Sequence, residues 1–511
     1  MAVLLIGLAA IPGISVTRRL SWPYDPDAFR DIAAAQAVRN GSWWSDPFYA
    51  GAALWYSPLV PAVVALLSWL ARLPVALVDV RGGPWLNLAA PVTFFSAAWR
   101  LVGVAPALCA LTVFLFLPLD APAWAAGTYT PWLFPGLVAQ SLLYIGLVGV
   151  AAVLEVAVAR RAVLMGLTVA VAFLAHPGAG IMLAATLGVS VLWQWWRAGT
   201  ITSPIRIIGI AGVVALALTS PLLLPLLVRY RLHVFNMAPA TWGYPEGRPA
   251  ALLSTLRQPG VWILLGLAST GAWTLRTRRS AGTAVVWSWG IVAVALSVYS
   301  LAAERGIGLP PLVPAYHFEF QVRAWGWMLI GVGAWALVST ALPDRVGSHG
   351  LLAVTLCSVL CLGTAAALYP FYLRRPAFTQ TAAVARDLGV SSDREASRWI
   401  AGSTPANAVV LASDEDGLYI VGPAGRRVVA VDAFFSNPYV DLQSRRNARE
   451  QMFAALASGD GPAFDVLAHQ YGVTHVLARD GVASKLLESD RLQPAFGTSE
   501  LTLFRVSSGG R

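Results

Sequence analysis

Charged residues are scarce in this 511-residue chain: only 12% of the residues are charged, whereas 57% are hydrophobic. In ordinary soluble proteins about a quarter of residues are charged, so that class is excluded. An intrinsically disordered chain is excluded as well, because disorder requires low hydrophobicity and high charge. The sequence therefore predicts a protein that crosses the membrane several times. The 21 Trp and 14 Tyr agree with this class, since their rings favour the membrane–water interface.

Lysine and cysteine are also rare. Lys485 is the only lysine, and the three cysteines are Cys109, Cys357 and Cys361, all in apolar runs. The last two are four residues apart on an expected helix, and we expect small packing residues there rather than a disulfide or a metal pair. The sequence has no Walker loop, no G-x-G-x-x-G turn and no zinc-spaced Cys/His set, which removes those nucleotide- and zinc-binding classes.

The density of charge changes near Arg375. Residues 1–375 hold 11 Asp/Glu and 23 Arg, whereas residues 376–511 hold 15 Asp/Glu and 13 Lys/Arg. This change predicts a multi-pass membrane domain over 1–375 and a soluble domain over 376–511. The basic excess of the membrane part indicates orientation signals and contacts with anionic membrane lipids, and not nucleic-acid binding.

The membrane part divides into apolar segments at charged or Pro/Gly-rich breaks. Because a helix needs about 20 residues to cross the hydrocarbon core and His176-Pro177-Gly178 should interrupt the longest stretch, we expect about 10–13 crossings. The segments are 2–16, 56–71, 84–99, 104–118, 136–159, 162–195, 205–228, 260–275, 282–303, 324–342 and 350–372.

The composition after residue 375 predicts a small α/β domain. Short apolar runs bounded by turn residues are typical of buried strands, and residues 441–458 have helical periodicity. The expected strands are 408–413, 426–431, 474–479 and the alternating segment 501–506.

Arginine placement predicts the orientation. Arginines at 160–161, 197, 276–279 and 345 fit the cytoplasmic side if the helices alternate. The later loops and the C-terminal domain then lie outside the cytoplasm. The loop at 17–55 should also lie outside if it holds the site argued below, but simple alternation between 56 and 118 does not place it there. One segment in that stretch must be re-entrant, lie along the interface, or consist of two short helices.

The most informative stretch follows the first expected helix. Four acids, Asp25, Asp27, Asp31 and Asp46, lie within 22 residues at a membrane face, whereas the rest of the membrane part carries seven. Acids at such positions are costly unless they are hydrated, paired or used. The acids lie in Tyr24-Asp25-Pro26-Asp27-Ala28-Phe29-Arg30-Asp31, followed by Asn40-Gly41-Ser42-Trp43-Trp44-Ser45-Asp46-Pro47-Phe48-Tyr49 and Trp55-Tyr56-Ser57-Pro58-Leu59.

This arrangement resembles the GT-C superfamily of membrane glycosyltransferases. The shared features are an acidic first external loop after helix one, an aromatic and Asp-Pro stretch, and a Tyr-x-Pro-Leu entry into the next helix, over residues 24–61. The resemblance implies a multi-pass helical membrane domain followed by an extracytoplasmic α/β domain. It also implies transfer of a sugar from a polyprenyl-phosphate donor to a glycan, glycolipid or protein acceptor of the cell envelope. Separately from the resemblance, the Ala-, Val- and Arg-rich composition suggests a high-GC bacterium, and in that setting mannose or arabinofuranose is the sugar we expect.

Such a transfer needs a carboxylate that takes the proton of the acceptor hydroxyl, and cationic groups or a metal that hold the departing phosphate. A single inverting displacement needs only one base. By the resemblance, Asp27 falls where the family's key acid lies, and Asp25 is the alternative base or a like-charged partner. The structural alternative is that both residues form a turn and a helix N-cap around Pro26.

Two further acids of the loop have open roles. Asp46 could bind acceptor hydroxyls or a divalent cation, Mg²⁺ or Mn²⁺, or it could form a plain Asp-Pro turn with Pro47. We expect Asp31 to be a solvated partner of Arg30.

A second group of polar residues precedes the segment at 324. Arg323 and His317 could contact the donor phosphate, since guanidinium groups bind phosphate oxygens in pairs. Arg305 belongs to the same loop. The alternative for Arg323 is an interfacial arginine that pairs with Glu319 while it reaches lipid headgroups.

Two more residues are candidates for substrate binding. His176 lies inside an apolar run, where an ionisable residue is a functional candidate, although a histidine beside a proline also hydrogen-bonds freed carbonyls. Glu246, in an aromatic-rich loop, could hydrogen-bond a sugar. Two rival functions stay open: a transporter or flippase of lipid-linked glycans, and a noncatalytic partner in envelope assembly. The flippase predicts charges along a central path through the helices, whereas the charges in this sequence gather in loops.

Overall fold

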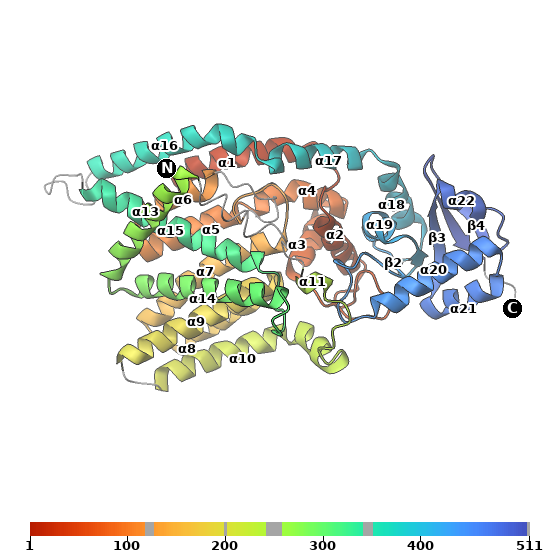
Figure 1. The fold of residues 1–511 in the computed structure, drawn as a ribbon, viewed down its shortest axis with the longest axis horizontal. Helices are drawn as coiled ribbons and strands as arrows, with labels where there is room; N and C mark the ends of the chain where they lie inside the picture. Colours follow the sequence, from red (N-terminus) through yellow and green to blue (C-terminus); the bar gives the residue numbers. More distant parts are fainter. Residues whose placement is uncertain (118–126, 199–201, 242–257, 341–350, 508–511) are drawn as a thin grey trace. The chain divides into compact units, whose positions relative to one another are not determined.

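The structure is a computed structural model that describes residues 1–117, 127–198, 202–241, 258–340 and 351–507 (Figure 1). The chain divides into two compact units. Unit 1 comprises Met1–Arg19, Gly83–Thr219 and Thr241–Gln380, and unit 2 comprises Leu20–Gly82, Ser220–Ala240 and Thr381–Arg511. Most of the acidic first loop is therefore grouped with the C-terminal part of the chain. The division at residues 375 and 376 stays a prediction.

Unit 1 is built from helices. Helix α7 contacts α5, α8, α9 and α14, and α15 contacts α6, α13 and α14. The helices are α1 (Ala2–Thr17), α5 (Ala89–Val102), α6 (Val104–Phe116), α7 (Pro135–Glu155), α8 (Ala159–Ala175), α9 (Pro177–Ala198), α13 (Pro259–Arg276), α14 (Ala281–Glu304), α15 (Tyr316–Thr340), α16 (Leu351–Leu373) and the 3₁₀ turn η3 (Pro376–Phe378). Helices α4 (Val75–Leu86) and α10 (Thr202–Leu224) contain the boundaries between the units.

Six helices among the described residues are long and apolar enough to span a membrane. A seventh candidate is a pair, Leu59–Ala71 and Val75–Val102, bent by 109°. The predicted multi-pass helical class is confirmed, but this criterion does not reach 10–13 crossings. The reason is length, since α1 has 16 residues and α6 has 13. The bent pair falls in the stretch where the arginine pattern conflicted with simple alternation.

Close helix packing in unit 1 depends on glycine. A Cβ at Gly333 of α15 would lie 1.9 Å from the carbonyl oxygen of Leu267 in α13, and a Cβ at Gly271 would lie 2.0 Å from that of Leu329. The two backbones therefore touch, as small residues permit between membrane helices.

The break expected in the long apolar stretch at 162–195 is confirmed. Helix α8 ends at Ala175, His176 has an extended backbone, and α9 begins at Pro177. Proline is favoured at the first position of a helix, because its missing N–H would have no partner there.

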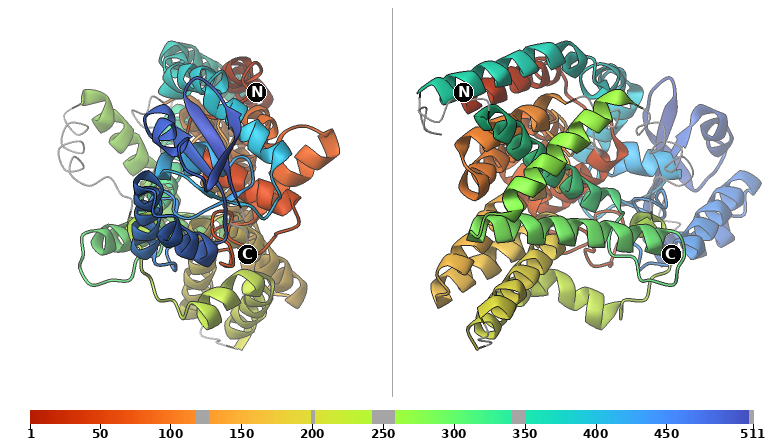
Figure 2. Two further views of the ribbon diagram at one scale, coloured as in Figure 1. Left: turned by 90° about the vertical axis from the view of Figure 1, so that its right-hand side faces the viewer. Right: turned by 60° about the vertical axis from the view of Figure 1, so that its left-hand side comes forward.

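Unit 2 combines helices with a five-stranded sheet of order β2-β1-β3-β5-β4. The strands are β1 (Val409–Leu411), β2 (Arg427–Val428), β3 (Val473–Arg479), β4 (Leu492–Gly497) and β5 (Leu501–Val506), and the first three are parallel while β5 runs antiparallel to β3 and β4. The helices are α2 (Pro26–Arg39), α3 (Leu59–Ala71), the π-helix η2 (Pro225–Arg229), α11 (Ala238–Thr241), α17 (Gln380–Gly389), α18 (Ser392–Ser403), α19 (Asp414–Asp416), the π-helix η4 (Gly417–Val421), α20 (Leu442–Ser458), α21 (Gly461–Tyr471) and α22 (Asp480–Leu486). Figure 2 shows the strands in blue.

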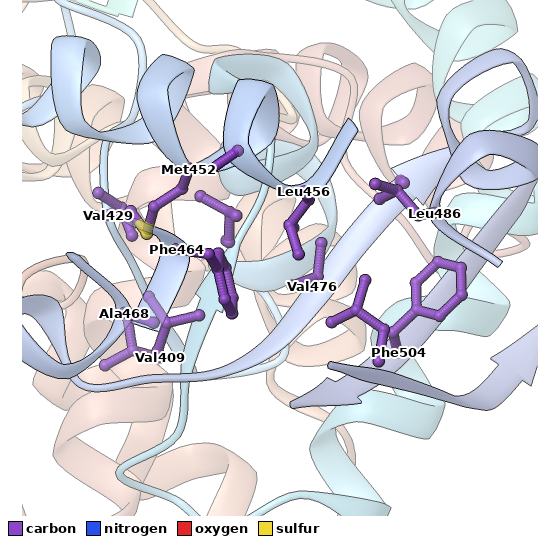
Figure 3. Packing of buried hydrophobic residues seen from close by; sticks show 14 of the residues in the cluster. Val409, Val429, Met452, Leu456, Phe464, Ala468, Val476, Leu486 and Phe504 are labelled. Carbon is purple, nitrogen blue, oxygen red and sulfur yellow. The ribbon is translucent and has the colours of Figure 1, made fainter. Parts of the chain in front are cut away.

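The sheet confirms the predicted α/β character of the C-terminal part. Its core contains Val409, Met452, Phe464, Val476 and Phe504, all buried (Figure 3). All four predicted strands are present, although β1 and β2 are short. Strand β4 was missed because it contains Pro494 and a bulge, and proline within a sheet is confined to edges and bulges.

Candidate active site

The acidic residues of the first loop are positioned by the start of helix α2. The side chain of Asp25 caps this helix, because its Oδ1 accepts a hydrogen bond of 3.0 Å from the backbone N–H of Asp27. Pro26 occupies the first helical turn, where it needs no hydrogen bond. The geometry of Asp25 therefore agrees with the alternative in which it forms the N-cap of a helix. Asp27 lies in the first turn, where the helix dipole stabilises a negative charge.

One buried arginine ties the acids together. Arg30 Nη1 lies 2.9 Å from Asp27 Oδ1, and Arg30 Nε lies 3.0 Å from Asp31 Oδ1. Its guanidinium carbon also lies 3.9 Å from the centre of the Tyr56 ring, in a cation–π contact. We call Asp25, Asp27, Arg30 and Asp31 the acid cluster. Asp31 does pair with Arg30, but it is buried, and the expected solvated position is wrong.

Burial controls the protonation of the acid cluster. Loss of hydration, followed by the negative charge of Asp27, raises the pKa of Asp25 to about 8. Burial also raises the pKa of Asp31 to about 6, although Arg30 opposes this rise. The charges of the acids keep the pKa of Arg30 above its usual value. Asp25 is therefore largely protonated at neutral pH.

Asp27 is the most accessible acid of the cluster. Its side chain is 14% exposed, against 5% for Asp31. Only its Oδ1 is engaged by Arg30, and among the described residues its Oδ2 makes no hydrogen bond or ion pair. An oriented carboxylate with one open oxygen can accept a proton from a hydroxyl group placed beside it.

Sequence reasoning missed one acid near this cluster. Asp79 of α4 is 3% exposed and has no hydrogen bond among the described residues. The ionisable group that interacts with it electrostatically is Asp31. Asp31 in turn has a buried Oδ2 without a hydrogen-bond partner. The signal was present, since an acid within an apolar helix is a functional candidate. Asp79 therefore joins the candidates for the site.

Asp46 is held by the protein itself. Its Oδ1 accepts hydrogen bonds from the N–H groups of Phe48 at 2.8 Å and Tyr49 at 2.9 Å, and its Oδ2 accepts one of 2.9 Å from the amide of Asn437. Burial raises the pKa of Asp46 to about 6. These contacts support the turn alternative, because three protein donors already use the oxygens that a cation or an acceptor sugar would need.

The same region joins the first loop to the C-terminal part within unit 2. The Tyr49 hydroxyl and the Ser436 hydroxyl share a hydrogen bond of 2.8 Å, and the N–H of Val428 donates to the carbonyl oxygen of Phe48 at 2.8 Å. Phe435 lies 6.0 Å from the Arg30 guanidinium carbon, measured to the ring centre. The C-terminal part therefore braces the loop that carries the acid cluster.

A second polar group lies in unit 1, where His176 and His317 stack with ring centres 4.0 Å apart. His176 directly precedes α9, and His317 is in the first turn of α15. A Cβ at Gly136, in the first turn of α7, would lie 3.1 Å from His317 Nδ1. Three helix N-termini thus meet at this histidine pair. Helix N-termini favour anions, because their N–H groups and dipoles point outward.

The remaining candidates are less closely placed. Arg323 lies one turn beyond Glu319 on α15, with its guanidinium 5.6 Å from the Phe320 ring. Arg305 ends α14 and is exposed. Glu304, beside it, accepts a hydrogen bond of 2.7 Å from the N–H of Ala315 and so fixes the loop before His317. Glu246 lies outside the described residues.

Protein groups already engage three acids of the first loop that could otherwise bind a Mg²⁺ or Mn²⁺ ion. Arg30 already neutralises Asp27 and Asp31, and protein donors hold Asp46. Within the described ranges, the one trio of metal-ligating side chains with ligand atoms within 4.8 Å of one another is formed by cysteines. A divalent cation at Asp46 was one of two alternatives, the contacts of Asp46 favour the turn, and no chemical step below uses a metal ion.

Comparison with solved structures places this geometry in a known fold. ArnT from Cupriavidus metallidurans bound to undecaprenyl phosphate matches 100% of this chain and 99% of its own, with a TM-score of 0.60 and 13% identity. An oligosaccharyltransferase from Archaeoglobus fulgidus matches 94% of this chain and 69% of its own, with a TM-score of 0.55 and 13% identity. The arabinofuranosyltransferase AftD from Mycobacteria matches 99% of this chain and 41% of its own, with a TM-score of 0.51 and 14% identity.

These likenesses establish the fold: the chain has the fold of the GT-C membrane glycosyltransferases, as the first loop indicated. No protein-family model matches the sequence, and no curated protein matches it either.

Proposed function

We propose that the protein is a glycosyltransferase that moves a sugar from a polyprenyl-phosphate donor to a cell-envelope glycan, glycolipid or protein. The observation that carries the proposal is the Asp27 carboxylate, fixed by Arg30 at the head of α2 with one oxygen open, on the GT-C fold. The undecaprenyl phosphate bound to ArnT supports a lipid-linked donor. The transfer takes place on the extracytoplasmic face, and the C-terminal part lies on that side.

In the proposed reaction, Asp27 Oδ2 takes the proton of the acceptor hydroxyl. The acceptor oxygen attacks the anomeric carbon of the donor sugar, and the bond from that carbon to the phosphate oxygen breaks. The electron pair of that bond leaves with the polyprenyl phosphate. One displacement inverts the anomeric configuration. Arg30 keeps Asp27 oriented, while Asp25, with its raised pKa, remains protonated and adds no charge.

The histidine pair is the proposed contact for the donor phosphate. His317 and His176 stack beside the N-termini of α7, α9 and α15, whose positive dipole ends favour an anion, and His176 Nδ1 accepts a hydrogen bond from the N–H of Gly178. A departing phosphate gains negative charge, and fixed donors of this kind stabilise it. Arg323 and Arg305 stay proposed contacts for the same phosphate or for nearby lipid headgroups, and Glu246 stays a proposed hydrogen-bond partner of a sugar.

Two donor classes are the first to assay. Mannose and arabinofuranose were expected from the sequence, and a mycobacterial arabinofuranosyltransferase shares the fold. The choice between hexosyl and pentosyl transfer is therefore tested with polyprenyl phosphomannose beside polyprenyl phosphoarabinose.

The experiment is reconstitution of the full chain in liposomes with each radiolabelled donor and with envelope glycans as acceptors. Label that moves from the lipid to the glycan supports the proposal. Movement of the intact donor between leaflets without transfer supports a flippase and contradicts the proposal. Neither activity, in a preparation that binds the donor, supports a noncatalytic role and also contradicts the proposal.

A further inference from the structure

The three cysteines of the chain lie together, although Cys109 is far from the other two in sequence. Cys109 is on α6, and Cys357 and Cys361 lie one turn apart on α16, which packs against α6 within unit 1. Their sulfur atoms all lie within 4.8 Å of one another, and the Cys109 and Cys357 sulfurs are 3.8 Å apart. All three side chains are buried, at 5%, 1% and 1% exposure.

This spacing fits three ligands around one metal ion. With metal–sulfur bonds of about 2.3 Å, a trigonal arrangement puts the sulfurs about 4 Å apart. A disulfide would need two sulfurs at about 2.0 Å and would leave the third thiol alone. The structure shows three free thiols instead.

The ligand set also discriminates between metals. Thiolate sulfur selects soft ions such as Cu⁺ and Zn²⁺. Structural Zn²⁺ is almost always four-coordinate, and iron–sulfur clusters are held by four ligands as a rule. Among the described residues, no His, Asp or Glu belongs to the cluster as a fourth ligand. Three sulfurs alone suit trigonal Cu⁺.

We propose that Cys109, Cys357 and Cys361 form a binding site for one Cu⁺ ion that clamps α16 to α6. Few other contacts hold helix α16, since only 22% of its candidate membrane span, Thr355–Leu373, is buried within the protein. It continues through η3 into the C-terminal segment. The clamp is independent of the proposed glycosyl transfer.

The test uses the purified full chain, without oxygen, titrated with Cu⁺ against a Cu⁺ chelator. One ion per chain is expected, with sulfur as the only neighbour in the X-ray absorption spectrum of the wild type. Each of Cys109→Ala, Cys357→Ala and Cys361→Ala should weaken binding at least about 100-fold, since even the loss of a group that only orients a metal ligand costs about 10–100-fold. Thr112→Val is the matched control, because Thr112 contacts Cys361 but leaves all three thiols, and it should bind as the wild type does.

Bound Cu⁺ should also raise the thermal midpoint of the wild type and not that of the cysteine variants, because a ligand of the folded state stabilises it. Three results would overturn the site: no binding in competition with the chelator, equal binding by a variant without the three cysteines, or nitrogen and oxygen neighbours in the spectrum. A mass two daltons below that of the reduced chain would show a disulfide and would overturn it too.

Discussion

The acid cluster of unit 2 and the histidine pair of unit 1 differ in how the chain makes them. The acid cluster comes from one helix start, within seven residues, and its arginine is part of the same turn. The histidine pair joins two distant segments, each placed by a helix that begins beside it. The proposed base is therefore locally encoded, whereas the proposed phosphate site requires the helix packing of unit 1.

The two groups also differ in charge. In the acid cluster the buried guanidinium of Arg30 pairs with both Asp27 and Asp31, so the charge balance of the cluster depends on this one residue. At the histidine pair two imidazole rings stack, and the helix N-termini beside them supply a positive potential. One group therefore suits a proton acceptor, and the other suits an anion.

The largest expected effect comes from removing the cation. Arg30→Met leaves buried carboxylates without their partner, and we expect a loss of stability of about 3–5 kcal/mol, as for a broken buried ion pair. The control is Arg39→Met on the same helix, where an exposed arginine bonds Ser68 and its loss costs at most about 1 kcal/mol. Thermal unfolding in detergent measures both. Equal effects would remove the distinction between the acid cluster and an ordinary helix surface.

A pH dependence should distinguish Asp25. Its pKa of about 8 in the folded state exceeds the usual value of about 4, so the folded chain holds a proton that the unfolded chain releases. This contribution to stability is complete below pH 4 and declines as the pH rises to about 8, by at most about 1.4 kcal/mol per pH unit. Asp25→Asn keeps a helix-capping side chain and should remove this contribution, while Asp31 and Asp46 keep their own declines up to about pH 6.

Thermal midpoints of wild type and Asp25→Asn between pH 5 and 8 test this directly. Curves that run parallel over this range would show that Asp25 is ionised when folded, which is the opposite of what its burial predicts.

The third prediction concerns the histidine pair. His317→Ala should raise the KM for the polyprenyl-phosphate donor about 10–100-fold, the cost of a hydrogen bond to a charged group. The matched change Arg279→Ala removes an exposed arginine to which no substrate contact is assigned, and it separates a specific contact from general loss of positive charge. If both variants raise KM equally, the histidine pair has no special role.

An effect of similar size is expected where the C-terminal part braces the loop. Asn437→Ala leaves Asp46 Oδ2 without its 2.9 Å hydrogen bond, which should cost about 1–3 kcal/mol. Gln443→Ala, on the exposed side of α20, is the control and should change stability by less than about 0.5 kcal/mol. An unchanged midpoint for Asn437→Ala would mean that this contact does not brace the loop.

Local patterns in the sequence identified much of this molecule. Low charge predicted the membrane class, His176-Pro177 predicted a helix break, and alternating residues predicted β5. Asp25 and Asp27 were singled out because acids gather in the loop after the first helix and because that loop resembles the GT-C family, whereas the ion pair between Arg30 and Asp27 was not predicted. The role of Asp27 as a base stays a prediction.

Other features depend on packing between distant segments, which spacing does not encode. The residues around Asp46 do not indicate its hydrogen bond with Asn437, and those around His176 do not indicate its stacking with His317. The burial of Asp31 was missed for the same reason, since helix periodicity does not show what covers each face. The number of crossings stays a prediction, since six described helices meet the length and composition criterion and two shorter apolar helices do not.

Whether Asp27 is the base for sugar transfer is tested most directly by single-turnover transfer, measured for the wild type and for Asp27→Asn at saturating donor. We expect the variant to bind the lipid donor normally and to transfer its sugar about 10²–10⁴-fold more slowly. A variant that transfers the sugar at the rate of the wild type would contradict the assignment of Asp27 as the base.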